Sequence, residues 1–147
     1  MATQVFDIPS SGGMGWLTSL LLLPLVIGIA LAIAFWPRPL RVEVTPAGLQ
    51  IRGSVYGRSV PRSEWQLDRA RVVDLAAEPE LKPIWRSNGV GWPNYRVGWF
   101  RLRDQERALC FLTSTQSVLY LPTTQNYALL ISSNDAAALL TALKSAG

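Results

Sequence analysis

The chain opens with a long apolar stretch and then changes to short alternating segments. From Trp16 to Trp36 no residue is charged, and a helix of this length would extend about 31 Å, close to the thickness of a bilayer's hydrocarbon core. The two tryptophans stand at the ends, where indole rings favour the membrane–water boundary. The pattern predicts one transmembrane helix over 16–36, preceded by an extracytoplasmic tail over 1–15.

The residues that flank this segment indicate whether it is cleaved and how it is oriented in the membrane. Ala32-Ile33-Ala34 resembles a signal-peptidase site, so a cleaved signal peptide is the alternative. The apolar run is long for a signal peptide, however, and no Lys or Arg precedes it. Arg38 and Arg41 follow it directly, and positive residues stay on the cytoplasmic side. We expect an uncleaved single-pass anchor with the N-terminus outside and the remaining chain in the cytoplasm.

Small residues in the apolar segment suggest a helix–helix contact. Gly28 and Ala32 are four residues apart and so lie on one side of a helix. Small side chains at this spacing let two membrane helices approach closely. The partner would be a second copy or a larger membrane protein. The alternative is that Gly and Ala are simply frequent in membrane helices.

Residues 38–147 alternate with the period of two that is typical of strands. The stretch 86–98 contains three Gly, one Pro and two Asn, which predicts a loop. Ser133 is placed to cap a final helix, whose apolar face repeats at helical spacing from Ala136 to Leu143. We therefore expect a curved antiparallel sheet or partly open barrel covered by that helix. The expected strands cover 40–44, 49–52, 54–56, 70–75, 99–103, 107–113, 117–121 and 127–131.

The order of short motifs resembles the bacterial pleckstrin-homology (PH) domain family. An Asn88-Gly89-Val90-Gly91 segment precedes Tyr95-Arg96-Val97-Gly98-Trp99-Phe100, and further strands and a C-terminal helix follow. The resemblance covers roughly residues 40 to 143. It implies a mainly β fold, a PH-like barrel of two near-orthogonal sheets capped by the C-terminal helix, and a membrane segment in front of the domain is common in such proteins. The family has no well-defined shared activity, so the resemblance implies an architecture more than a function.

Composition points away from catalysis. The 147 residues include no His and one Cys, and 14 basic against 10 acidic residues give a net charge of +4. Without His the commonest general base and a frequent metal ligand are missing. Cys110 lies in an apolar strand, where a buried structural thiol is expected. We predict no enzyme activity, no cofactor and no metal site. Nucleic acid is not expected either, because the final helix carries only Lys144 as a basic residue.

Two groups of residues are candidates for an interaction surface. The first is basic and lies near the strands at 99–113; it comprises Arg96, Arg101, Arg103 and Arg107, with Trp99 beside them. The second is the aromatic pair Trp92 and Tyr95 in the glycine-rich segment, which either packs on the domain or recognises a partner.

These candidates predict a module that binds a protein or peptide partner at the cytoplasmic face of the bacterial inner membrane. The alternative function is weak, non-selective binding of anionic lipid by the arginine face. The resemblance to PH domains also suggests phosphoinositide binding, for which lipid-binding members of that fold gather basic residues around the first hairpin loop. Here the loop over 45–48 contains no cation, so selective phosphoinositide binding is disfavoured.

Overall fold

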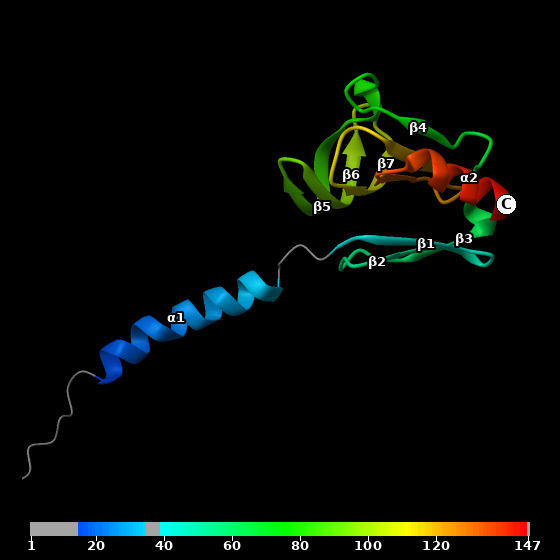
Figure 1. Cartoon of the computed structure of the whole chain (residues 1–147). Coiled ribbons are helices and arrows are strands. Elements are labelled where there is room, and N and C mark those ends of the chain that lie inside the picture. Colours follow the sequence, from blue (N-terminus) through cyan, green and yellow to red (C-terminus); the bar gives the residue numbers. More distant parts are fainter. Residues whose placement is uncertain (1–14, 35–38, 147) are drawn as a thin grey trace, which may run out of the picture. The chain divides into compact units, whose positions relative to one another are not determined.

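The computed structural model describes residues 15–34 and 39–146, and the chain divides into two compact units, residues 1–37 and 38–147 (Figure 1). The first unit contains one helix, α1 (Gly15–Ala34), with Pro24 inside it. Residues 1–14 of the tail predicted over 1–15 and the predicted end of the span at Trp36 lie outside the described residues, and Gly15 is the first residue of α1.

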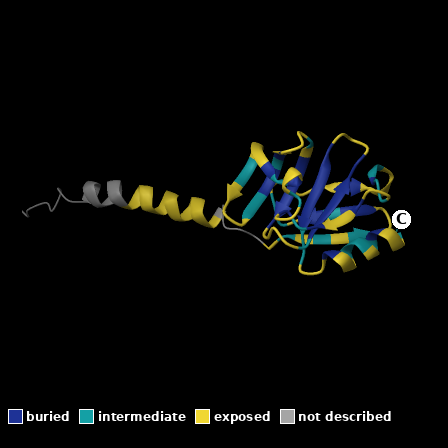
Figure 2. Cartoon of the chain, turned by 90° about the horizontal axis from the view of Figure 1, so that it is seen from above, coloured by how far each residue is buried: buried dark blue, intermediate teal, exposed yellow. Residues whose placement is uncertain are grey.

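Side chains of α1 are described for residues 22–33, and all of them are exposed (Figure 2). They include large apolar groups such as Leu23 and Ile33, which are 63% and 67% exposed. Among the described residues, no helix is both long and apolar enough to cross a membrane.

The second unit contains two sheets and a C-terminal helix (Figure 1). The small sheet has the strand order β1-β2-β3 and the large sheet has the order β4-β8-β9-β7-β6-β5. Two short 3-10 helices, η1 and η2, lie in the connections. The bounds are β1 (Arg41–Thr45), β2 (Gly48–Arg52), β3 (Ser59–Pro61), η1 (Arg62–Glu64), β4 (Arg71–Val73), η2 (Pro79–Leu81), β5 (Pro83–Trp92), β6 (Tyr95–Leu102), β7 (Arg107–Leu112), β8 (Val118–Pro122), β9 (Ala128–Ser132) and α2 (Ala136–Ala146).

The large sheet is buried on both faces. Alternate residues of β6, β7 and β9, such as Val97 and Leu129, pack in a core with the small sheet and with Leu143 of α2. The intervening residues, such as Phe100 and Leu130, pack in a second core that includes Leu75 and Leu81. Burial on both faces explains why the central strands β7, β8 and β9 are almost continuously apolar.

The predicted mainly β architecture with a C-terminal helix is confirmed, but the predicted barrel is wrong. Neither sheet closes on itself, and no strand of the small sheet pairs with a strand of the large sheet. An isolated bridge joins Trp65 and Thr123, which lie outside the named strands. The expectation of purely antiparallel pairing is also wrong. Strand β9 lies between β8 and β7; it pairs antiparallel with β8 and parallel with β7.

The stretch 86–98 is not a loop but most of a hairpin. Strands β5 and β6 pair from Pro83 to Leu102 around a tight connection at 93–94. Gly89 lies opposite Gly98, which has a φ of +122°. A Cβ on Gly98 would lie 2.5 Å from the Asn88 carbonyl oxygen and from the Cα of Gly89. The glycines that suggested a loop thus permit two backbones to approach more closely than side chains would allow.

Two smaller expectations are also corrected. Residues 54–56 form a turn instead of a strand, because the Ser54 hydroxyl and carbonyl accept hydrogen bonds from Tyr56 N–H and Gly57 N–H. The cap of α2 is Asp135 instead of Ser133. Its carboxylate accepts a hydrogen bond from Ala138 N–H at 2.8 Å, and the helix begins at Ala136.

The close approach of β5 and β6 predicts a strong difference between two glycine substitutions. Gly98→Ala should lower the free energy of unfolding by about 2 kcal/mol or more, because it combines a disfavoured φ with a backbone clash. Gly91→Ala in the same hairpin is the matched control, because its Cβ would meet nothing closer than 3.7 Å. Urea unfolding of both variants tests this, and equal stability would contradict the strained approach.

Candidate functional site

The structure separates the predicted basic residues. Side chains alternate along β6, so Trp99 and Arg101 share one face while Arg96 lies on the opposite face, near Cys110. Arg103 follows the last residue of β6 and is exposed. Trp99 and Arg101 thus lie on one face, as alternation along the strand predicts, and Arg96 lies on the other face of the sheet.

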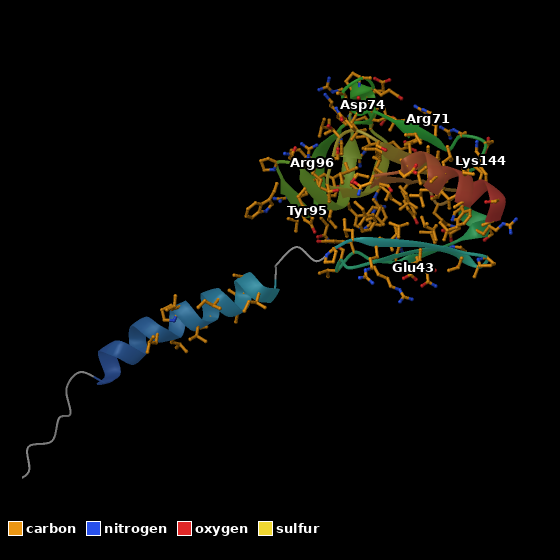
Figure 3. All side chains as sticks on the ribbon, viewed as in Figure 1. Glu43, Arg71, Asp74, Tyr95, Arg96 and Lys144 are labelled. Atoms are coloured by element: carbon orange, nitrogen blue, oxygen red, sulfur yellow. The ribbon has the colours of Figure 1, made fainter. Side chains whose placement is uncertain are left out.

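The two aromatic residues of the glycine-rich segment behave differently. Trp92 ends β5 and is 70% exposed, so the packing interpretation is wrong for this side chain. Tyr95 is partly buried against the core between the sheets, as packing predicts. In Figure 3, Tyr95 and Arg96 lie together at this end of the β5–β6 hairpin.

Trp99 belongs to a cluster that the sequence did not reveal. Its ring meets the Tyr127 ring edge-on at a centroid distance of 5.2 Å. The guanidinium carbon of Arg107 lies 4.6 Å from the centroid of the Trp99 ring, and that of Arg58 lies 5.7 Å from it. We call Trp99, Tyr127, Arg58 and Arg107 the Trp99 cluster. Stacking of this kind holds an arginine in place while its edge remains free to donate hydrogen bonds.

The Trp99 cluster lines an open cavity of about 400 Å³ at the β3 edge of the small sheet. Ser59, Pro61, Glu64 and Gln125 complete the lining. Within the described part of the chain, ion pairs join Arg52 to Glu43 and Arg71 to Glu78, and none involves the cluster. The two guanidinium groups are thus without an acidic partner there.

Hydrogen bonds fix the segment that carries Tyr127. The Thr123 hydroxyl and N–H both donate to the Tyr127 carbonyl, at 2.7 and 3.0 Å. Thr124 N–H donates to the Glu64 carbonyl at 2.9 Å, which ties this loop to η1. Burial raises the pKa of the Tyr127 hydroxyl; the nearby Arg58 charge opposes this effect and Glu64 adds to it. The cluster therefore sits in a partly desolvated, preorganised environment.

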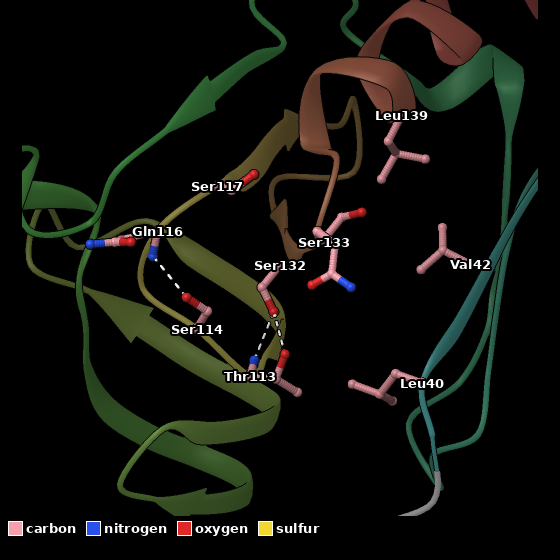
Figure 4. Close-up of a pocket in the computed structure, with 10 residues that line it drawn as sticks. Leu40, Val42, Thr113, Ser114, Gln116, Ser117, Ser132, Ser133 and Leu139 are labelled. Atoms are coloured by element: carbon pink, nitrogen blue, oxygen red, sulfur yellow. Dashed lines mark hydrogen bonds between the residues drawn. The ribbon is translucent and has the colours of Figure 1, made fainter.

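A second recess lies on the other side of the small sheet, beside its β1 edge (Figure 4). Its volume is about 610 Å³. Leu40, Val42 and Leu139 form an apolar side, and hydroxyl and amide groups form the opposite side. We call this recess the β1 groove; its polar lining consists of Thr113, Ser114, Gln116, Ser117, Ser132, Ser133 and Asn134.

The polar side of the β1 groove is held in a fixed geometry. The Ser132 hydroxyl accepts a hydrogen bond from Thr113 N–H at 2.7 Å and lies 3.0 Å from the Thr113 hydroxyl. Gln116 N–H donates to the Ser114 hydroxyl at 3.1 Å. The contacts between Thr113 and Ser132 connect the 113–117 loop to the end of β9, and the Gln116–Ser114 bond lies within that loop (Figure 4).

The backbone of β1 presents unpaired groups along its outer edge. Ile51 N–H donates to the Arg58 carbonyl at 3.0 Å, so the backbone groups of Ile51 face β3. Val42 lies opposite Ile51, and this is therefore a non-hydrogen-bonded pair. It follows that Val42, and Val44 two residues along, direct their N–H and C=O groups away from β2. Among the described strands, β2 is the one partner of β1.

Alternation within a strand could have located part of these sites. It places Arg107 diagonally across from Trp99 on the same face, through the pairs Trp99–Leu109 and Arg101–Arg107. Arg58 and Tyr127, by contrast, reach Trp99 from distant parts of the chain and carried no local signal. The β1 groove likewise joins three separate segments.

The chemistry available for catalysis is limited in the described residues. Cys110 is buried, as predicted, and burial raises the pKa of its thiol. Within residues 15–34 and 39–146, no group of three or more potential metal ligands comes together. The arrangement suits binding through hydrogen bonds, charge and apolar contact.

The predicted contact residues Gly28 and Ala32 lie in α1 on its exposed surface. A Cβ added to Gly28 would meet nothing within 4 Å. Their role in helix association stays a prediction.

Comparison with known proteins identifies a family that matches most of the chain. The family model described as bacterial PH domain covers residues 40–147. No curated protein and no solved structure matches the chain.

Proposed function

We propose that this chain, which belongs to the bacterial PH domain family, is a membrane-anchored module that binds an extended peptide segment of a partner protein. Domains of this family are interaction modules and not enzymes. The observation that carries the peptide proposal is the unpaired edge of β1 beside the β1 groove.

An extended peptide fits this edge for a physical reason. The N–H and C=O groups of Val42 and Val44 can pair with an added strand, as free sheet edges do in other recognition domains. Alternate side chains of the peptide would then enter the β1 groove, between the apolar wall with Leu139 and the hydroxyl groups of the 113–117 loop. The other edge of the small sheet is less suitable, because β3 has three residues and ends at Pro61.

The second part of the proposal places the module at the cytoplasmic face of the bacterial inner membrane. Support comes from the sequence, in which the apolar stretch over 16–36 contains no charged residue and is followed by arginines. An anchor would raise the local concentration of the module near membrane partners. Non-selective lipid binding is the weaker alternative, because the sheet divides Arg96 from Arg101.

The strand-addition proposal predicts a specific effect of proline at the β1 edge. Val42→Pro should weaken binding of an extended peptide, selected from a random library on the full-length chain, by about tenfold. The substitution removes an outward donor and leaves the β1–β2 hydrogen bonds in place. Val42→Ala is the matched control, since it shortens the side chain and keeps the N–H.

Titration calorimetry gives the affinities, and amide hydrogen exchange at Val44 should slow when the peptide binds. Equal affinity of the Val42→Pro and Val42→Ala variants, with no protection at Val44, would contradict strand addition.

The anchor predicts the behaviour of the full-length chain in cells. It should remain in the membrane pellet after alkaline carbonate extraction, and a reporter active only outside the cytoplasm should be silent when fused after Gly147. An active reporter would reverse the orientation. Recovery of a soluble chain that begins at Phe35 would show cleavage and remove the anchor.

We further propose that the anchor associates through Gly28 and Ala32, with a second copy or with another membrane protein. Replacing both with Ile should reduce association of the helix in membranes, measured by energy transfer between labelled copies and by recovery of co-purifying membrane proteins. Replacing Leu22 and Val26, which have the same spacing, with Ile is the matched control. Unchanged association in the Gly28/Ala32 variant would mean that the small residues form no contact.

A further inference from the structure

The Trp99 cluster has the features of a ligand site that is separate from the β1 groove. The β1 groove lies at the β1 edge of the small sheet, and the cavity over the Trp99 cluster lies at its β3 edge. Its volume of about 400 Å³ falls in the range of small-molecule sites. An interpretation of this cavity therefore depends neither on strand addition nor on the anchor.

The charges in the cavity favour an anion. Arg58 and Arg107 contribute two guanidinium groups, and Glu64 contributes one carboxylate. No described acidic side chain lies within ion-pairing distance of either arginine, Glu64 included. Among the described residues neither guanidinium donates a side-chain hydrogen bond, so their N–H groups are available to a ligand.

The arginines are also oriented before any ligand arrives. Arg107 lies over the Trp99 ring, and Arg58 lies within 5.8 Å of both ring centroids, those of Trp99 and Tyr127. A guanidinium group that rests on a ring loses less side-chain entropy when it binds, and its N–H groups match carboxylate or phosphate oxygens in pairs. Two guanidinium groups held on aromatic rings beside one cavity favour a binding site over an ordinary solvated surface.

The aromatic rings add a second requirement for the ligand. Trp99 and Tyr127 both line the cavity, and each is partly or largely buried against the core. A ligand that carries an apolar or aromatic group next to its charge could cover these rings as well as pair with the arginines. A bare ion would use the charges alone.

We propose that the Trp99 cluster binds an organic anion whose carboxylate or phosphate group pairs with Arg58 and Arg107 and whose apolar part lies against Trp99 and Tyr127. Strand addition, proposed for the β1 edge, is not expected at the β3 edge, because Pro61 lacks an N–H and β3 is short. Recognition is through side chains, which suits a small molecule or a single acidic group.

The test uses the full-length chain in a mild nonionic detergent and four probes: benzoate, phenyl phosphate, acetate and inorganic phosphate. Binding is followed by NMR through the indole N–H resonance of Trp99, which is identified by its loss in the Trp99→Phe variant. Each titration is made at constant ionic strength, and sodium chloride serves as the reference anion. Either benzoate or phenyl phosphate should saturate the site at a concentration at least tenfold lower than acetate and inorganic phosphate require. Comparison of benzoate with phenyl phosphate then shows whether the site prefers a carboxylate or a phosphate.

Variants separate this site from general charge attraction. Arg107→Gln and Arg58→Gln should each weaken binding of the preferred probe about tenfold or more, and Arg107→Lys should recover part of it. Arg103→Gln is the matched control: it removes an exposed cation outside the cavity and should leave the affinity unchanged. Equal responses to all anions and to chloride, or unchanged binding in both glutamine variants, would overturn the proposal.

Discussion

Burial of the large sheet on both faces is the constraint on which the rest of this domain depends. Its central strands are apolar on both faces, so each face must be covered by another part of the chain. The small sheet and α2 cover one face, and the segment with Leu75 and Leu81 covers the other. The hydrophobic contact between the two sheets replaces the hydrogen bonds that would close a barrel.

This arrangement leaves two openings, one at each edge of the small sheet. The β1 edge borders the β1 groove, and the β3 edge borders the cavity of the Trp99 cluster. A closed barrel would have paired both edges with neighbouring strands and removed these recesses. The binding potential of the domain therefore follows from the same packing that keeps its sheets separate.

The two openings differ in the kind of contact they offer. At the β1 groove the backbone of Val42 and Val44 is unpaired, and ordered hydroxyl groups face an apolar wall. At the Trp99 cluster the backbone is protected by Pro61, and two arginines stacked on aromatic rings provide the polar groups. The unpaired backbone and the stacked arginines thus lie at opposite edges of one three-stranded sheet.

The sequence alone determined the features that depend on neighbours along the chain. Alternation gave the β1–β2 hairpin, the pair β8 and β9 and the apolar face of α2, and the motif order indicated the family. Tertiary structure decided the remainder. Gly89 and Gly98 signal a loop by composition, and only the contact between two backbones makes them strand residues. Tyr127 meets Trp99 along one face of the large sheet, because β9 and β6 both pair with β7. Arg58 reaches the same ring from the segment that precedes β3 of the small sheet. Contacts between distant segments leave no period in the sequence, so neither site could be predicted in full.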